Sequence, residues 1–387
     1  MTETLIVNAL VDGKAADIFV ADGIIAGISD AGSSPAGGEA AFDAGGRAVL
    51  PGFVDCHTHA CFAGSRLDEW ERKLAGASYL ELMEAGGGIM ATVRATRKAS
   101  ETELAELLLA RLNRMLAHGS TTVEVKSGYG LDTENELKML RAIARAGESF
   151  PGTVIPTACI GHAIDPDVEP ERFVRRTIDE TLPAVAAEFP GIALDAYCEK
   201  GAWSLDDCLA LFDAGQAAGH PIRVHADQFN ALGMIGAAVE RGFVSVDHLE
   251  ATDEGGLLTL AGSRTFGVML PASGFHLDDR YGDGRAFIDA GGRMALATNY
   301  NPGSAPCWSM PFVVALAVRR LGLTPAEAIH ASTAAGAELL ALPDRGRIEP
   351  GMRADLVVLD CADARSLAFE FGGNPVARVM VAGQWAC

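Results

Sequence analysis

The chain has 387 residues, a formal net charge of −20 and a hydrophobic content of 49%. The negative charge argues against a surface that binds nucleic acid or an anionic membrane. The sequence has no run of ~18 apolar residues that would predict a transmembrane helix. Neither nucleic acid nor a membrane is therefore expected as a partner.

The N-terminus and the cysteines predict a cytoplasmic location. The first residues, MTETLIVNALVDGK, contain neither a basic segment nor a long apolar segment, so they do not resemble a signal peptide. The eight cysteines form no CxxC pair. In a chain of this size without a signal peptide, we expect free buried thiols rather than disulfides.

Both ends of the chain are rich in short strands. The first 50 residues contain TLIVNAL, DIFVADG, GIIAGISD and RAVL, separated by Gly and Asp. The segments RGRIEPGMRADLVVLD and ARVMVAGQWA repeat this pattern near the other end. We therefore predict one small β-sandwich domain, built from residues 1–50 and 345–387, with the main domain at 51–344 inserted between them.

The main segment alternates between short β-branched runs and amphipathic helical patterns. The eight candidate strands are RAVLPGFVDCHTH, STTVEVKSG, GTVIPTACIGHA, GIALDAYCE, PIRVHADQ, FVSVDHLE, TFGVMLP and RMALATNYN. The helical patterns include SYLELMEAGGGIMATVRATRKA, ENELKMLRAIARAGE, LDDCLALFDAGQAAG and WSMPFVVALAVRRLG. This alternation predicts an α/β fold, a (β/α)8 TIM barrel. The rival, an open doubly wound sheet, would need GxGxxG after its first strand, and that motif is absent there. The GGG at 86–88 follows a helical pattern and is interpreted as a loop or hinge.

The first predicted strand ends in two histidines, His57 and His59. Because side chains alternate along a strand, this spacing places both imidazoles on one face. Two imidazoles at the end of a strand suit a divalent metal. Taken alone, the pair also fits two polar histidines on a solvated strand.

Further histidines follow other predicted strands. They are His162, His225 and His248, so five of the nine histidines lie at strand ends. In a barrel these ends meet at one rim, which favours a functional site. Three imidazoles, from His57, His59 and His225, would leave positions open for water and substrate, as in a catalytic metal site. The remaining histidines, His118, His220, His276 and His330, are expected to be structural or solvated.

These residues carry a family resemblance. The histidine pattern resembles the amidohydrolase superfamily, and within it the chain is similar to the imidazolonepropionase family of histidine degradation. The matching stretches are HTHACFAGSRLDEWERKLAGASYLELMEAGGGIMATVRATR, KSGYGLDTENELKML, GHA, HADQF, DHLE and NPGSAPCWSMPFVVALA.

The resemblance implies an activity and a set of roles. One zinc or iron ion would hydrolyse a ring C–N bond of 4-imidazolone-5-propanoate, a small anionic ring, to give N-formimino-glutamate, in a homodimer. Strand four offers Cys198 and Glu199 instead of the lysine of binuclear relatives, which supports a single ion. The metal would be bound by His57, His59 and His225. The catalytic centre would include His248 and Gln228. The substrate would be bound by Arg66, Tyr129, His162, Gln228, Asn301, Gly303 and Ser304. The alternative for Arg66 is a salt bridge with Asp68 or Glu69.

The chain departs from the family pattern at Asn299, where an aspartate is expected to approach the metal and to accept a proton. Asparagine offers an oxygen but cannot act as a base near pH 7. Hydrolysis is therefore expected to be impaired, with metal and ligand binding weakened but retained. The chain could be an inactivated variant, or a relative that uses His248 alone as its base, or an enzyme for a different ring.

Three alternatives follow from these observations. Cys307 and Trp308 could reshape the pocket for a 2-thio or 2-oxo analogue of the ring. The chain could instead be a deaminase of the same superfamily. A non-catalytic ligand-binding barrel is the alternative from a different class.

Overall fold

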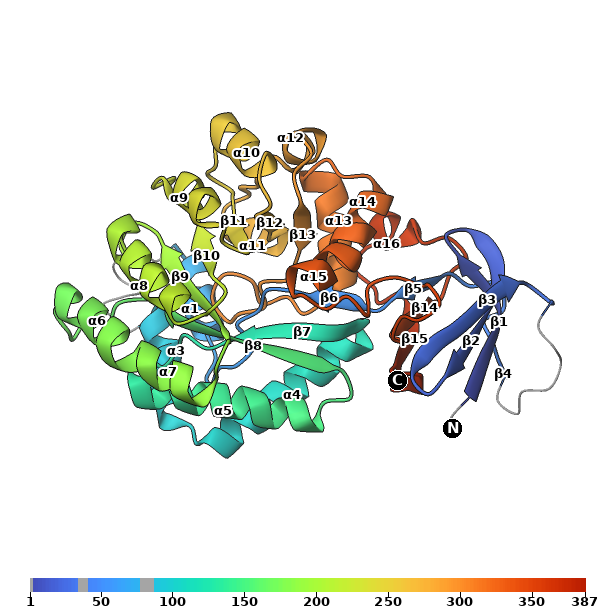
Figure 1. Ribbon diagram of the computed structural model, residues 1–387, viewed down its shortest axis with the longest axis horizontal. Helices are drawn as coiled ribbons and strands as arrows, with labels where there is room; N and C mark the ends of the chain where they lie inside the picture. The colour runs from blue at the N-terminus through green and yellow to red at the C-terminus, as the bar shows by residue number, and fades with distance from the viewer. Residues whose placement is uncertain (1–2, 34–40, 77–86) are drawn as a thin grey trace.

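The computed structural model describes residues 3–33, 41–76 and 87–387. Eight parallel strands follow one another in chain order around a barrel, which confirms the predicted TIM-barrel architecture (Figure 1). They are β6 (Phe53–Asp55), β7 (Ser120–Lys126), β8 (Thr153–Gly161), β9 (Ala193–Cys198), β10 (Arg223–Ala226), β11 (Ser245–His248), β12 (Phe266–Met269) and β13 (Met294–Leu296).

The barrel closes beyond the ends of its first and last strands. The Asn299 amide donates a hydrogen bond to the His57 carbonyl at 3.0 Å, and the His59 amide donates to the Tyr300 carbonyl at 3.0 Å. The segment that carries the HxH pair is therefore joined directly to the segment that carries Asn299.

Helices surround the barrel. They are α1 (Leu67–Leu74), α3 (Ile89–Lys98), α4 (Glu101–Ala117), α5 (Thr133–Ser149), α6 (Pro170–Arg176), the π-helix η1 (Thr177–Thr181), α7 (Leu182–Glu188), α8 (Leu205–Ala217), α9 (Met234–Arg241), α10 (Glu254–Ala261), α11 (Pro271–Leu277), α12 (Gly284–Asp289), α13 (Met310–Arg320), α14 (Pro325–Ala331), α15 (Ala334–Leu339) and α16 (Ser366–Phe369). Two of them, α1 and α11, border a cavity at the rim of the barrel. The helix predicted from residue 78 falls partly on residues 77–86, outside the described part of the chain. Its remainder forms α3, and Gly88 precedes that helix with φ 71°.

Two four-stranded sheets form a separate small domain at one end of the molecule, where both termini lie (Figure 1). The first contains β1 (Glu3–Val11), β2 (Lys14–Ala21), β3 (Ile24–Asp30) and β4 (Ala41–Asp43), and the second contains β5 (Val49–Pro51), β14 (Leu356–Leu359), β15 (Val376–Val381) and β16 (Gln384–Trp385). Ile6, Ile18, Leu356 and Val358 share the core between the sheets. The predicted domain limits at 50/51 and 344/345 stay a prediction.

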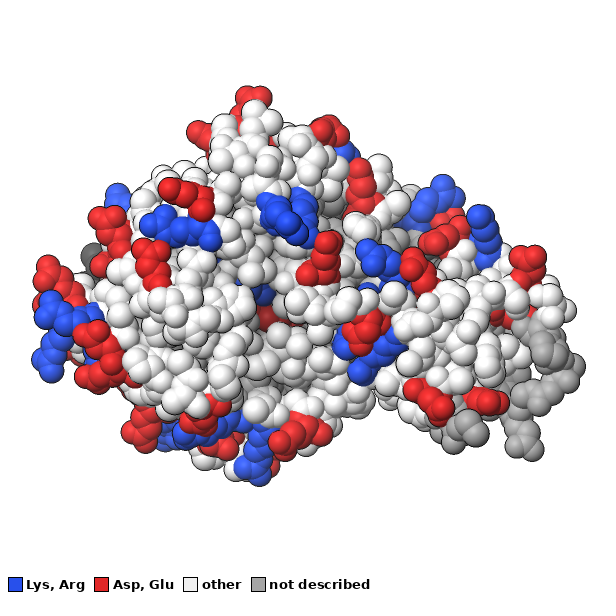
Figure 2. Space-filling view, in the orientation of Figure 1, with Lys and Arg blue, Asp and Glu red and all other residues white. Residues whose placement is uncertain are grey.

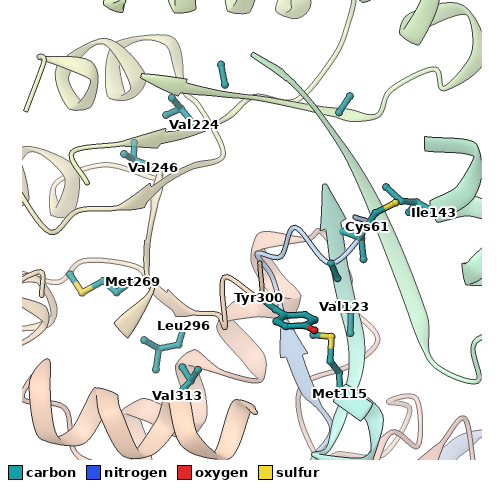
Figure 3. Close-up of a cluster of buried hydrophobic side chains, with 14 of the residues drawn as sticks. Cys61, Met115, Val123, Ile143, Val224, Val246, Met269, Leu296, Tyr300 and Val313 are labelled. Atoms are coloured by element: carbon teal, nitrogen blue, oxygen red, sulfur yellow. The ribbon is translucent and has the colours of Figure 1, made fainter. Parts of the chain in front are cut away.

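Alternation along the barrel strands separates apolar from charged side chains. Val224 and Val246 are paired in register on neighbouring strands and belong to the main hydrophobic core (Figure 3). His225 and Asp247 directly follow these two valines. Because side chains alternate along a strand, they have the opposite orientation and face the barrel interior. The same strands thus supply both the packing and the polar groups of the site.

The exposed charges are mixed over the face seen in Figure 2, with acidic and basic side chains interspersed. Within the described residues, no helix has the length and apolarity needed to cross a membrane.

Candidate active site

A cavity of about 1010 Å³ opens at the C-terminal ends of the barrel strands. The predicted site residues that line it are His59, Arg66, Tyr129, His162, His225, Gln228, His248, Asn299, Asn301, Gly303 and Ser304. His57 is fully buried behind the cavity wall. The structure therefore brings together every predicted site residue.

Three histidines form the candidate metal centre. One nitrogen from each of His57, His59 and His225 lies within 4.8 Å of the others. The Nε2 atoms of His59 and His225 are 2.9 Å apart. Nε2 of His57 and Nδ1 of His59 are buried and have no hydrogen-bond partner among the described residues. Converging imidazoles with an unpaired buried nitrogen fit a divalent metal.

Two carboxylates hold two of these rings from behind. Asp247 Oδ2 lies 2.6 Å from His57 Nδ1, and Asp195 Oδ1 lies 2.9 Å from His225 Nδ1. A carboxylate on Nδ1 fixes the proton there and leaves Nε2 as the ligand atom. Both rings are therefore oriented for metal binding by the protein itself.

The electrostatics keep the three imidazoles neutral. Burial lowers the pKa of His57 and His59 well below the ordinary value, and neighbouring charged groups lower it further. Burial also lowers the pKa of His225, although Asp195 partly opposes this shift. A neutral imidazole is the form that binds a metal.

His59 is held differently, by ring stacking. The His162 ring is nearly parallel to the His59 ring, with an interplanar angle of 14° and centroids 4.6 Å apart. His162 Nδ1 lies 2.9 Å from the Gly128 carbonyl, which leaves its Nε2 available to the cavity. Burial lowers the pKa of His162 to about 4, so it is a neutral acceptor at neutral pH.

A second group of possible ligands, Cys159 with Asp195 and His225, lies next to the first. Both oxygens of Asp195 already have partners, because His225 contacts Oδ1 and Lys126 donates to Oδ2 at 2.8 Å. This arrangement disfavours a second ion and agrees with the prediction of a single one.

His248 projects into the cavity because its backbone leaves the regular strand. Its φ is 99°, followed by 74° at Leu249, in a region that non-glycine residues seldom adopt. Glu250 holds Nδ1 of His248 with its two oxygens at 3.1 and 3.2 Å. Nε2 is then the atom that His248 can present to a water molecule.

Asn299 also has a positive φ, 53°. Its Nδ2 donates to Ser273 Oγ at 2.8 Å, while Oδ1 is buried and has no hydrogen-bond partner within the described part of the chain. An unpaired buried oxygen beside the metal centre fits a neutral oxygen ligand.

Arg66 lines the cavity and also forms a salt bridge with Glu69, which was the alternative to a role in substrate binding. Nε donates to Glu69 Oε2 at 2.6 Å, and Nη2 pairs with Oε1 of the same carboxylate. A Cβ added to Gly303 would lie 3.0 Å from Nη1 of Arg66, so this nitrogen faces the loop that carries Gly303. One edge of the guanidinium is therefore paired with Glu69, and the other edge faces the loop that carries Gly303.

Asn301 supports that loop from within. Its Oδ1 accepts from the amides of Gly303 and Ser304 at 2.8 and 2.7 Å. Its Nδ2 donates to the Asn299 carbonyl and to Ser304 Oγ. With both ends of the amide engaged, Asn301 shapes the pocket rather than offering a free group to a ligand.

Gln228 presents its amide nitrogen to the cavity. Tyr197 OH donates to Oε1 of Gln228 at 2.7 Å, which leaves Nε2 as the available donor. An amide is neither acid nor base near pH 7, so Gln228 can only bind or orient a substrate.

Several important residues were not predicted from the sequence. They are Glu136, which accepts hydrogen bonds from the amides of the loop around Tyr129, the carboxylates Asp195 and Asp247 behind the ligands, and His276 at the cavity wall. For Asp195 and Asp247 the available signal was an acidic residue within an apolar strand, because a buried carboxylate needs partners. His276 is partly exposed at the cavity wall, and its expected structural or solvated character stays a prediction.

Cys307 and Trp308, which were suggested to reshape the pocket, do not themselves line the cavity. Cys307 Sγ is directed to the Ser309 carbonyl, and Trp308 packs edge-on against Tyr300 with centroids 5.9 Å apart. A 2-thio or 2-oxo ring substrate is therefore not favoured.

Comparisons with known proteins agree with this geometry. The family model described as "Amidohydrolase family" matches residues 48–386. The imidazolonepropionase of Herpetosiphon aurantiacus is 47% identical over 88% of this chain and 83% of its own. The chain belongs to the imidazolonepropionase family of amidohydrolases. The imidazolonepropionase of Myxococcus xanthus is 42% identical over 98% of this chain and 92% of its own.

Solved structures show the same amidohydrolase architecture. A 5-methylcytosine deaminase from Klebsiella pneumoniae superposes with a TM-score of 0.77 at 17% identity, covering 100% of this chain and 97% of its own. An adenosine deaminase from Xanthomonas campestris with bound zinc gives 0.71 at 17% identity, covering 99% and 92%. At this identity the likeness concerns the fold alone.

Proposed function

We propose that this imidazolonepropionase-family protein opens the ring of 4-imidazolone-5-propanoate with water and releases N-formimino-L-glutamate. The observation that carries the proposal is the convergence of His57, His59 and His225 at the base of a cavity, with His248 beside them. The family membership supplies the substrate, because the similar proteins are named imidazolonepropionase.

The reaction adds one water across a ring C–N bond. The water oxygen bonds to the ring carbonyl carbon, the C–N bond breaks, and the leaving nitrogen takes up a proton. His57, His59 and His225 would hold a zinc or iron ion, which would supply Lewis-acid activation when bound, because such ions lower the pKa of bound water to roughly 7.

The chain's own groups divide the remaining tasks. Nε2 of His248 accepts the proton of the attacking water, with the imidazole held by Glu250. Tyr129, His162 and Gln228 bind the ring. Gly303 and Ser304 close the pocket around the propionate side chain of the substrate. Asn299 contributes an oxygen but no base, so this chain has one proton acceptor fewer than the family pattern.

Arg66 is proposed to bind the propionate. Its Nη1 faces the loop of Gly303, and a planar guanidinium suits a carboxylate. Replacing Arg66 with Met is expected to raise KM by about 10- to 100-fold, as for a lost charge-assisted hydrogen bond, with a smaller change in kcat. Steady-state kinetics would measure both constants. The control is Arg72→Met on the exposed face of α1, and equal KM values in the two variants would contradict the role of Arg66.

The test of the function is product analysis. The purified protein, with its metal content measured, is incubated with imidazolone propionate, and N-formimino-glutamate is expected. Ammonia released without formimino-glutamate would support a deaminase instead. Tight ligand binding without any product, even from the Asn299→Asp variant, would support a non-catalytic barrel.

The proposal extends to a cytoplasmic homodimer. All eight cysteines are free, which suits a reducing compartment. Metal analysis would decide between zinc and iron, and sedimentation would test the dimer.

A further inference from the structure

Five charged side chains fill the barrel interior beneath the metal centre. They are Glu124, Lys126, Asp195, Arg223 and Asp247, each at most 2% exposed. None of them lines the cavity, so none contacts a substrate there. Buried charges are costly unless each has a partner, which makes the pattern of their contacts informative.

The contacts form two similar chains of hydrogen bonds. In the first, Asp247 Oδ2 contacts His57 Nδ1 at 2.6 Å and accepts from Arg223 Nη2 at 2.7 Å. In the second, Asp195 contacts His225 Nδ1 at 2.9 Å and accepts from Lys126 Nζ at 2.8 Å. Each ligand histidine is therefore backed by a carboxylate, and each carboxylate by a cation.

Glu124 joins these two chains. Its Oε1 accepts from Lys126 Nζ at 2.7 Å and lies 3.3 Å from Arg223 Nη1. Its Oε2 accepts from the amide of Thr58 at 3.0 Å. Thr58 lies between His57 and His59, so one carboxylate contacts both cations and the backbone of the HxH pair.

We propose that Glu124 is a positioning residue for the metal centre. Acting through Lys126 and Arg223, it holds His57, His225 and the HxH backbone as one unit, so that the ligand atoms converge before an ion binds. A rotation of either ring would break its contact with Asp247 or Asp195, and each of these carboxylates is held by a cation that also contacts Glu124. The inference rests on the proposed metal-dependent function.

The test is Glu124→Gln, which keeps the side-chain shape and removes the charge. The full-length variant is expected to bind zinc about 10- to 100-fold more weakly than the original chain, the usual effect of losing a group behind a metal ligand. Competition with a chromogenic chelator measures the affinity. Glu136→Gln is the matched control, because Glu136 is another buried carboxylate whose partners include the amides of Gly128, Gly130 and Leu131. Its zinc affinity should stay within about twofold of the original value.

Unchanged zinc affinity in folded Glu124→Gln would overturn the inference. An original chain without zinc affinity would overturn the proposed metal centre as well, so the two failures are distinguishable. Circular dichroism establishes folding. If Glu124→Gln does not fold, nitrogen-15 NMR of histidine-labelled, zinc-loaded original protein is the second measurement. Protected protons on Nδ1 of both His57 and His225 are expected, and an Nδ1 proton on either ring that exchanges rapidly with solvent would overturn the inference, because the ring would then not be held from behind.

Discussion

The Asn299→Asp variant is expected to turn over imidazolone propionate about 100-fold faster than the original chain, because a positioned general base typically contributes 10²–10⁴. Asn299 lies just beyond the last barrel strand, and its backbone N–H donates a hydrogen bond to the carbonyl of His57. An aspartate has the same shape. One of its oxygens can accept from the Ser273 hydroxyl, and the other can occupy the position of the unpaired Oδ1.

The same substitution adds a negative charge to a buried position. We therefore expect Asn299→Asp to destabilise the metal-free protein and to bind a divalent ion more tightly, because the ion compensates the charge. Thermal unfolding with and without zinc measures this difference. The kinetic comparison is made at equal metal content, so that a change in kcat reports proton transfer.

Asn301→Asp is the control for this prediction. Asn301 is a neighbouring buried asparagine, but its Nδ2 donates two hydrogen bonds that an aspartate cannot make. We expect that variant to lose activity. Equal turnover by the original chain and Asn299→Asp, both fully loaded, would contradict the general-base argument and leave His248 as the base.

His225→Ala is expected to lower zinc affinity by about 10³-fold and to abolish hydrolysis. Apparent binding free energies of zinc sites are roughly 10–16 kcal/mol, so losing one of three imidazoles should cost about 4 kcal/mol. The loss also leaves Asp195 without its contact to Nδ1. Metal analysis and chelator competition measure the affinity.

His220→Ala provides the control for His225→Ala. His220 is buried outside the cavity, and its Nδ1 lies 2.8 Å from the Ile192 carbonyl. This variant should lose some stability and keep its zinc affinity. Zinc should raise the Tm of the original chain and of His220→Ala but not of His225→Ala, because only binding to the folded state stabilises it. Full zinc binding by His225→Ala would contradict the assignment of the metal centre.

The sequence was sufficient for the architecture and for the rim of the site. Alternating β and α patterns predict the barrel, and polar residues after apolar strands identify the cavity wall, because the carboxyl ends of parallel strands share one rim. His57, His59, His225 and His248 are all of this kind. Their partners could not be predicted, since nothing local links His57 to Asp247, which lies 190 residues away.

The tertiary structure decided how those residues are held and which of them are free to act. Arg66 is partly engaged by Glu69, and Asn301 is fully engaged within its own loop. Such distinctions depend on the conformation that each loop adopts in the folded chain, and residue type does not reveal them. The sequence by itself determined that a metal-type histidine cluster ends the strands of a barrel. Only the folded chain places Glu124, with its two cations, beneath that cluster, because barrel closure brings the interior faces of separate strands into contact.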